Sequence, residues 1–231
     1  WSAIDTADYF TDTLPADSTN LRISEVNYNP HDPLTQLGEE DVDNDQFEFI
    51  EIVNIANRPV ELDAVEFVQR DSEGIVFTFG DQTLAPNEYL VVPKNRSAFV
   101  SRFGSEVPLA VGLGDDPDQW VYEGRLGNGG ERITLVDPSG QSIQSLAYDD
   151  SSAWPGRSDG NGSALEIINV EGDVSDPDNY RSSSEFGGSP GVLGNGPDNR
   201  IVINEVLANS DLPDVDTVEL FNTSLTPSDR S

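Results

Sequence analysis

Residues 47–54 read FEFIEIVN, and residues 215–222 repeat their pattern as VDTVELFN. A matching partner stands upstream of each stretch, LRISEV at residues 21–26 and IVINEV at residues 201–206. Both copies predict a strand, an acidic loop, a second strand and an Asn at a turn. Because self-similarity within one chain is typical of arrays of modules, we expect residues 200–231 to open a second, truncated copy and the chain to be part of a longer polypeptide.

The charge of the chain limits its partners. Forty-three acidic residues face twelve basic ones, which gives a formal net charge of −31, and Lys94 is the only lysine. Nucleic acid is held mainly by basic side chains that neutralise phosphates, so binding of nucleic acid by this segment is not expected. Divalent cations, basic proteins or a salty medium fit such a surface. The chain has no cysteine, which excludes disulfides and thiolate metal sites.

Short apolar stretches alternate with turn signals along the chain. We expect strands over residues 21–28, 46–54, 60–69, 75–79, 89–93, 132–137, 142–148 and 164–168. Many short strands at this spacing indicate an all-β sandwich or barrel. Alternate strand positions face inward, which predicts a core that includes Ile23, Ile50, Ile52, Leu90, Val92, Ile133 and Leu135. Residues 97–103 are the one stretch that predicts a short helix, with Phe99 and Phe103 on one face.

An acidic loop precedes the strand at residues 46–54. Asp41, Asp43 and Asp45 alternate as oxygen ligands do at the start of a calcium loop. Glu48 and Glu51 follow on the strand, and Glu25 lies on the strand predicted to pair with it. The predicted calcium ligands are therefore Glu25, Asp41, Asp43, Asp45, Glu48 and Glu51. The second copy keeps Glu205 and Glu219. The alternative interpretation is that these acids are solvated and that one Glu accepts backbone N–H groups.

Several strings in this order resemble one known family. They are ISEV at residues 23–26, FIEIVN at 49–54, PVEL at 59–62, LGNGGERITLVD at 126–137 and GGSPG at 187–191. Together they resemble the lamin tail domain, including its bacterial and archaeal secreted form. The resemblance covers residues 21–191 and implies an all-β fold, an immunoglobulin-like antiparallel sandwich. The chain departs from the family where Ala64-Val65 replaces the usual Gly-Trp.

The resemblance also implies a function. It predicts a non-catalytic structural, adhesive or protein-binding module of a large exported prokaryotic surface protein, located outside the cell or at its surface. The partners would be other proteins or neighbouring repeats of the chain. The alternative is an accessory domain of a secreted hydrolase, a nuclease or phosphatase whose catalytic domain lies elsewhere. His31, the only histidine, lies in a proline-rich turn without an activated-serine motif around it, so we expect no catalytic residues.

The same signals divide the chain. Residues 1–20 are polar and aperiodic and predict an N-terminal tail or linker. Residues 21–191 form the predicted sandwich with its C-terminal strap. The Gly- and Pro-containing stretch at residues 192–199 predicts a linker, and residues 200–231 are the predicted second copy. No apolar run approaches the roughly 20 residues that span a bilayer, so we expect no membrane insertion by this segment.

Overall fold

The computed structural model describes residues 13–70, 73–196, 200–208 and 215–224. The chain divides into two compact units, residues 1–194 and residues 195–231. The boundary between them falls within the stretch predicted as a linker.

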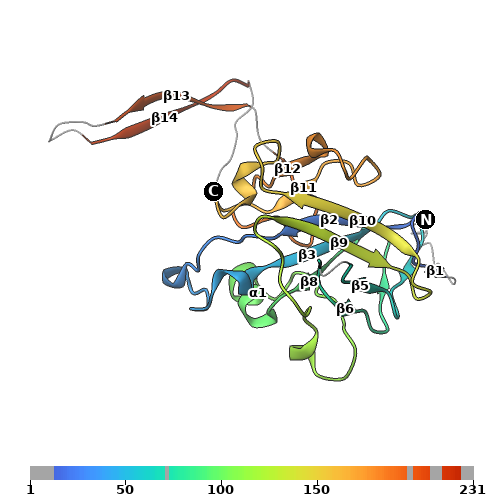
Figure 1. Ribbon diagram of the computed structural model, residues 1–231. Coiled ribbons are helices and arrows are strands. Elements are labelled where there is room, and N and C mark those ends of the chain that lie inside the picture. Colours follow the sequence, from blue (N-terminus) through green and yellow to red (C-terminus); the bar gives the residue numbers. More distant parts are fainter. Residues whose placement is uncertain (1–12, 71–72, 197–199, 209–214, 225–231) are drawn as a thin grey trace, which may run out of the picture. The chain divides into compact units, whose positions relative to one another are not determined.

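The first unit is built on two larger antiparallel sheets (Figure 1). The five-stranded sheet has the order β12 (Tyr180–Ser182), β11 (Leu165–Ile167), β2 (Leu21–Asn27), β3 (Phe49–Asn54), β8 (Tyr89–Pro93). The four-stranded sheet has the order β10 (Ser142–Asp149), β9 (Gly130–Val136), β5 (Glu66–Val68), β6 (Phe77–Thr78). A small sheet of β1 (Leu14–Pro15), β4 (Val60–Glu61) and β7 (Thr83–Leu84) completes the described part of the unit.

The inner faces of the sheets share one hydrophobic core. All seven predicted core residues belong to it, and each has at most 1% of its surface exposed: Ile23, Ile50, Ile52, Leu90, Val92, Ile133 and Leu135. Packing of two sheets through alternate side chains is the arrangement of a β-sandwich. The predicted fold class, an immunoglobulin-like all-β sandwich, is therefore confirmed.

A smaller apolar cluster covers the outer face of the five-stranded sheet. The helix α1 (Arg96–Phe103) begins at Asn95, whose side chain accepts from two backbone N–H groups, a standard N-terminal cap. Phe49 of β3 meets the rings of Phe99 and Phe103 edge-on, with ring centroids 5.6 Å apart in both pairs. The helix predicted over residues 97–103 is thus present one residue longer, and it packs on the sheet through the predicted face.

Short 3-10 helices and a long C-terminal segment complete the unit. The 3-10 helices are η1 (Thr35–Leu37), η2 (Asn44–Phe47), η3 (Pro117–Gln119), η4 (Gly156–Ser158) and η5 (Pro177–Asn179). Residues 183–194, called the strap below, run from the end of β12 over the outer face of the five-stranded sheet. Gly188 of the strap lies directly against Phe49 and Ala164 of that face.

The structure differs from the predicted elements most clearly at residues 13–20, 46–48 and 60–69. Residues 13–20 are not a tail, because β1 pairs with β4 and Ala16 is buried in the core; residues 1–12 lie outside the described residues. The strand predicted over residues 46–54 begins only at Phe49, since η2 occupies its first part. The strand predicted over residues 60–69 is two strands separated by a turn at Ala64, whose φ of 60° lies in the left-handed region that glycine adopts without strain.

The second described unit is a hairpin of β13 (Ile201–Leu207) and β14 (Thr217–Asn222). Its register runs from Ile201 opposite Asn222 to Leu207 opposite Thr217, with a bulge between Ile203 and Glu205. Most of its side chains are exposed.

Candidate functional site

Four adjacent strands place charged residues in one row on the outer face of the five-stranded sheet. Glu51 of β3 pairs with Glu25 of β2, and Glu25 pairs with Glu166 of β11. Glu166 in turn pairs with Arg181 of β12. Directly paired strand residues bring their side chains together. The result is a row of three glutamates that ends in one arginine, called the carboxylate row below.

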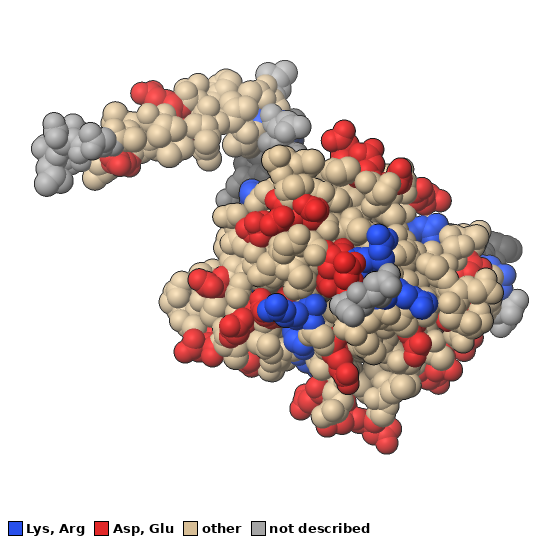
Figure 2. Space-filling view, viewed as in Figure 1, with Lys and Arg blue, Asp and Glu red and all other residues tan. Residues whose placement is uncertain are grey.

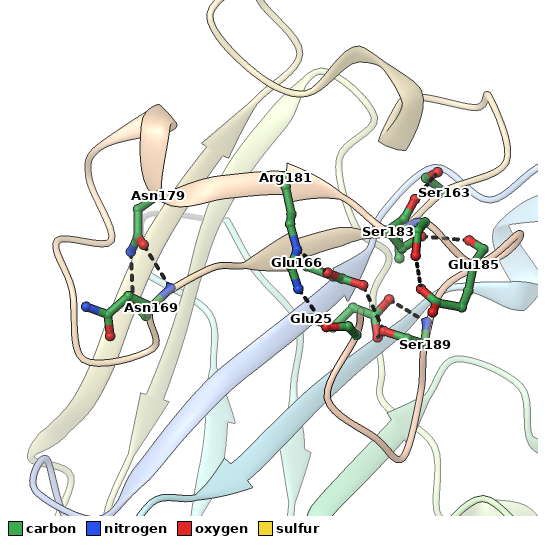
Figure 3. A network of polar contacts seen from close by, with 12 residues as sticks. Glu25, Ser163, Glu166, Asn169, Asn179, Arg181, Ser183, Glu185 and Ser189 are labelled. Carbon is green, nitrogen blue, oxygen red and sulfur yellow. Dashed lines mark hydrogen bonds and ion pairs between the residues drawn. The ribbon is translucent and has the colours of Figure 1, made fainter. Parts of the chain in front are cut away.

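The strap lies on this row and bonds to it through its backbone (Figure 3). The N–H of Ser189 donates to Glu25 Oε1 at 2.9 Å, and the N–H of Gly191 donates to Glu51 Oε2 at 2.6 Å. The Ser189 hydroxyl donates to Glu166 Oε1 at 2.9 Å. Each glutamate of the row therefore has a hydrogen-bond donor in the strap.

Two further oxygens of the row also accept hydrogen bonds. Ser24 Oγ donates to Glu51 Oε1 at 2.6 Å. Arg181 Nε donates to Glu166 Oε2 at 2.6 Å, and Arg181 Nη2 donates to the carbonyl of Gly194 at 2.7 Å. One guanidinium thus binds the row and the end of the strap at once.

Glycine allows the strap to come this close. A Cβ at Gly188 would stand 2.8 Å from Glu25 Oε1, and the φ of Gly188 is +123°. A Cβ at Gly194 would overlap the carboxylate of Glu166. Both positions need a residue without a side chain, which gives a physical reason for the Gly-rich sequence predicted as a strap and linker.

Burial changes the acidity of the row. Glu25 and Glu51 are each 1% exposed and Glu166 is 4% exposed. Loss of hydration raises the pKa of Glu51 to about 8, and it also raises the pKa of Glu25, which the charge of Glu51 raises further. Three carboxylates face a single guanidinium, so full ionisation would leave uncompensated charge in a dry site. In neutral solution the row therefore retains a proton, shared within the coupled pair of Glu25 and Glu51.

A crevice of about 150 Å³ opens beside the row. Its polar wall includes Glu25, Glu51, Glu166, Arg181 and Ser189. Exposed apolar side chains stand at its edge: Ile168, Val192 and Leu193, which are 50%, 61% and 68% exposed.

The six predicted calcium ligands do not form one group. Glu25 and Glu51 belong to the carboxylate row, whereas Asp43 caps η2 by accepting from the N–H of Asp45 at 3.1 Å. Asp41 lies in a bend and no bond of its side chain joins it to the row. The acidic loop and the carboxylate row are therefore separate places.

Glu48 lies in a third place, at the end of the core. Its Oε2 accepts from the Tyr122 hydroxyl at 2.6 Å and from the N–H of Leu126 at 3.0 Å. Its Oε1 is buried and has no hydrogen-bond partner among the described residues. Burial raises the pKa of Glu48 to about 7. Among the described residues, no three acidic or histidine side chains are arranged to hold a metal ion, so calcium binding stays a prediction.

Sequence reasoning brought Glu25 and Glu51 together but missed the other half of the row. Glu166, Arg181 and Ser189 come from segments more than 100 residues away, and only the fold joins them to β2. A signal was present nonetheless. Glu166 stands alone between apolar residues of β11, and a lone carboxylate on a buried strand needs a partner.

The surface of the first unit is acidic in many places. On the face seen in Figure 2, Asp and Glu form scattered groups, with a few basic side chains between them. Elsewhere Arg102 and Glu39 form a nearly buried ion pair at 2.9 Å, and the Arg102 guanidinium stacks 3.7 Å from the ring centroid of Phe47. The only α-helix in the described part of the chain, α1, has eight residues and is too short to cross a bilayer.

The donors to the carboxylate row belong to the protein itself. Glu25 accepts through Oε1, and both carboxylate oxygens of Glu51 and of Glu166 accept from donors within the protein, while the strap covers the row. His31 lies in its predicted turn, stacked on Phe186 with ring centroids 4.3 Å apart, and burial lowers the pKa of its imidazole.

No curated protein sequence matches this chain. Among protein families, the lamin tail domain matches residues 15–150, which span β1 to the end of β10 and include Glu25 and Glu51. The match ends before β11, β12 and the strap. Because it extends over more than half of the sequence, and because the two-sheet fold agrees with it, the chain belongs to the lamin tail domain family.

Proposed function

We propose that the chain is a non-catalytic structural or adhesive module of a large exported protein, arranged in tandem with further lamin tail domains. Its contacts would be with other proteins or with neighbouring repeats. The internal use of the buried carboxylates and the non-catalytic character of the family support the first part. The acidic, cysteine-free composition suits an extracellular or cell-surface location.

The register of the hairpin β13–β14 carries the tandem arrangement. In β2–β3 the pairs run from Leu21 opposite Asn54 to Asn27 opposite Phe49, with a bulge between Ile23 and Glu25. In β13–β14 the same sequence of pairs recurs, bulge included. Turns and bulges set the register of a strand pair, so the hairpin has the geometry of the first strand pair of a second domain.

The acidic pair of the domain recurs as well. Glu205 stands opposite Glu219, as Glu25 stands opposite Glu51. Asn204 donates to Glu219 Oε1, where Ser24 donates to Glu51 Oε1. The hairpin thus repeats the start of the carboxylate row and not only its apolar pattern.

Limited proteolysis of the natural protein tests this proposal. We expect one resistant fragment that ends near residue 194 and another that begins near residue 200 and contains a second sandwich, identified by intact mass. A natural protein in which residues 200–231 are digested and no second resistant domain follows would contradict the tandem arrangement. A resistant fragment with phosphodiesterase or phosphatase activity would favour the alternative, an accessory domain of a secreted hydrolase.

A separate experiment tests the predicted calcium binding. The loop at Asp41, Asp43 and Asp45 keeps the alternate spacing of hard oxygen ligands. If calcium binds the folded chain there, chelation lowers the melting temperature, and calcium restores it where the same ionic strength of sodium does not. An unchanged melting temperature in metal-free protein would contradict the prediction.

A further inference from the structure

The strap is attached to the sheet mainly through polar contacts at its C-terminal part. Residues 188–194 bond to Glu25, Glu51 and Glu166 through Ser189 and Gly191, and to Arg181 through the Gly194 carbonyl. The apolar side chains in this part point outward, since Val192 is 61% exposed and Leu193 is 68% exposed. What fixes these residues is therefore the carboxylate row more than apolar burial.

The charges around the row come from every element that packs on it. β3, β2 and β11 each contribute one glutamate, β12 contributes Arg181, and β8 contributes Tyr89, which lines the crevice. Glu185 is the one charged residue of the strap sequence, and its carboxylate accepts from the Ser184 hydroxyl. The Arg181 guanidinium thus bonds to a row of three carboxylates.

We propose that residues 188–194 form a pH-dependent latch, which is closed on the sheet while the carboxylate row holds protons and opens increasingly as the row ionises with rising pH. Opening lets water reach the carboxylates. Their negative charges then no longer lie in the low-dielectric site beneath the strap. It also uncovers Phe49 and Ala164, against which Gly188 packs in the closed state.

The direction of the pH effect follows from the shift at Glu51. Its pKa is about 8 under the closed strap and returns toward the ordinary value of a solvated carboxylate, about 4.3, when the strap opens. Opening therefore releases a proton between these two values. The closed state is fully stable at low pH and loses stability as the pH rises, by a factor of about ten in the opening equilibrium per pH unit for one proton.

Amide hydrogen exchange on the full chain measures this opening. We expect the protection factors of the Ser189 and Gly191 N–H groups to fall about 100-fold between pH 6 and pH 8. Protection in β9 and β10, whose strands lie in the other sheet, reports global unfolding. Because the latch opens without unfolding of the sandwich, Ser189 and Gly191 should be less protected than these strands at every pH. Protection factors of the Ser189 and Gly191 N–H groups that stay constant between pH 6 and pH 8 would overturn the latch.

Two variants separate the carboxylate from general effects of pH. Glu51→Gln keeps an acceptor for the Gly191 N–H but cannot ionise, so its protection should stay nearly constant from pH 6 to pH 8. Glu61→Gln, on the exposed side of β4, should behave as the unmodified chain. A fall in Glu51→Gln as steep as in the unmodified chain would overturn the proposal. If Glu51→Gln loses protection in β9 and β10, the same profile is taken on Glu25→Gln, whose protection should also fall less steeply.

Discussion

The strand pairs β2–β3 and β13–β14 have one register and one bulge, yet they lie in opposite surroundings. Ile23 of the first pair is fully buried, whereas Ile203 at the matching position is 65% exposed. The two glutamates of the first pair are covered by the strap, and those of the second are open to solvent. Pairing geometry is thus set by the local sequence, and burial is set by what packs on the pair.

Because of this difference in burial, the two strand pairs should differ in how much they contribute to stability. An isolated two-stranded hairpin is marginal in water, because its strands bury little apolar area. In the first unit the same pair gains a neighbour strand on each edge, a facing sheet and the strap. A substitution that strongly lowers the stability of the first unit in β2–β3 should therefore have little effect on that stability at the matching position of β13–β14. Matched substitutions test this directly.

The largest contrast is expected at Ile52 and Leu220, which occupy matching positions opposite Ile23 and Ile203. Ile52→Ala removes buried methyl groups and leaves a cavity, so it should lower the free energy of unfolding of the first unit by about 2–5 kcal/mol. Leu220 is 64% exposed, and Leu220→Ala should change it by less than about 0.5 kcal/mol. Urea unfolding of both variants measures this difference. Equal losses of unfolding free energy in the two variants would contradict the expected contrast between β2–β3 and β13–β14.

A smaller contrast is expected in the pH dependence of stability. The pKa of Glu51 is raised to about 8 by burial, so the folded state holds a proton that the unfolded state releases. Stability is then highest at low pH and falls by about 2–3 kcal/mol between pH 6 and pH 8 from this group alone. Urea midpoints across this range should fall in the unmodified chain and in Glu219→Gln. In Glu51→Gln the fall should be clearly smaller, and an undiminished fall would show that other groups control it.

The smallest effect is expected when two core residues of β3 are replaced by those at the matching positions of β14. Ile50→Val with Ile52→Leu gives β3 the residues that β14 carries at Val218 and Leu220. Because the register is shared and the side-chain volumes are similar, the double variant should lose no more than about 2 kcal/mol and should keep its fold by circular dichroism. Collapse of the fold would show that the hairpin residues do not suit the sandwich, which would weaken the assignment of a second domain.

The sequence was sufficient for the sandwich because its long strands alternate and its turns are marked by Gly and Pro. β1, β7 and β12 were not predicted, since strands of two or three residues leave no measurable period. The site was half predictable for a related reason. Glu25 and Glu51 repeat at Glu205 and Glu219, but the approach of Glu166, Arg181 and the strap depends on contacts between segments far apart in the chain.

The carboxylate row also has a consequence for how the chain finds its fold. Successive strand residues point to opposite faces, so a slip of one residue in β2 or β11 would turn Glu25 or Glu166 into the apolar interior. Such a misfolded arrangement would bury a carboxylate away from Arg181 and from the strap amides. The row therefore favours the native register during folding, because only the native strand pairing places all three glutamates where donors can reach them.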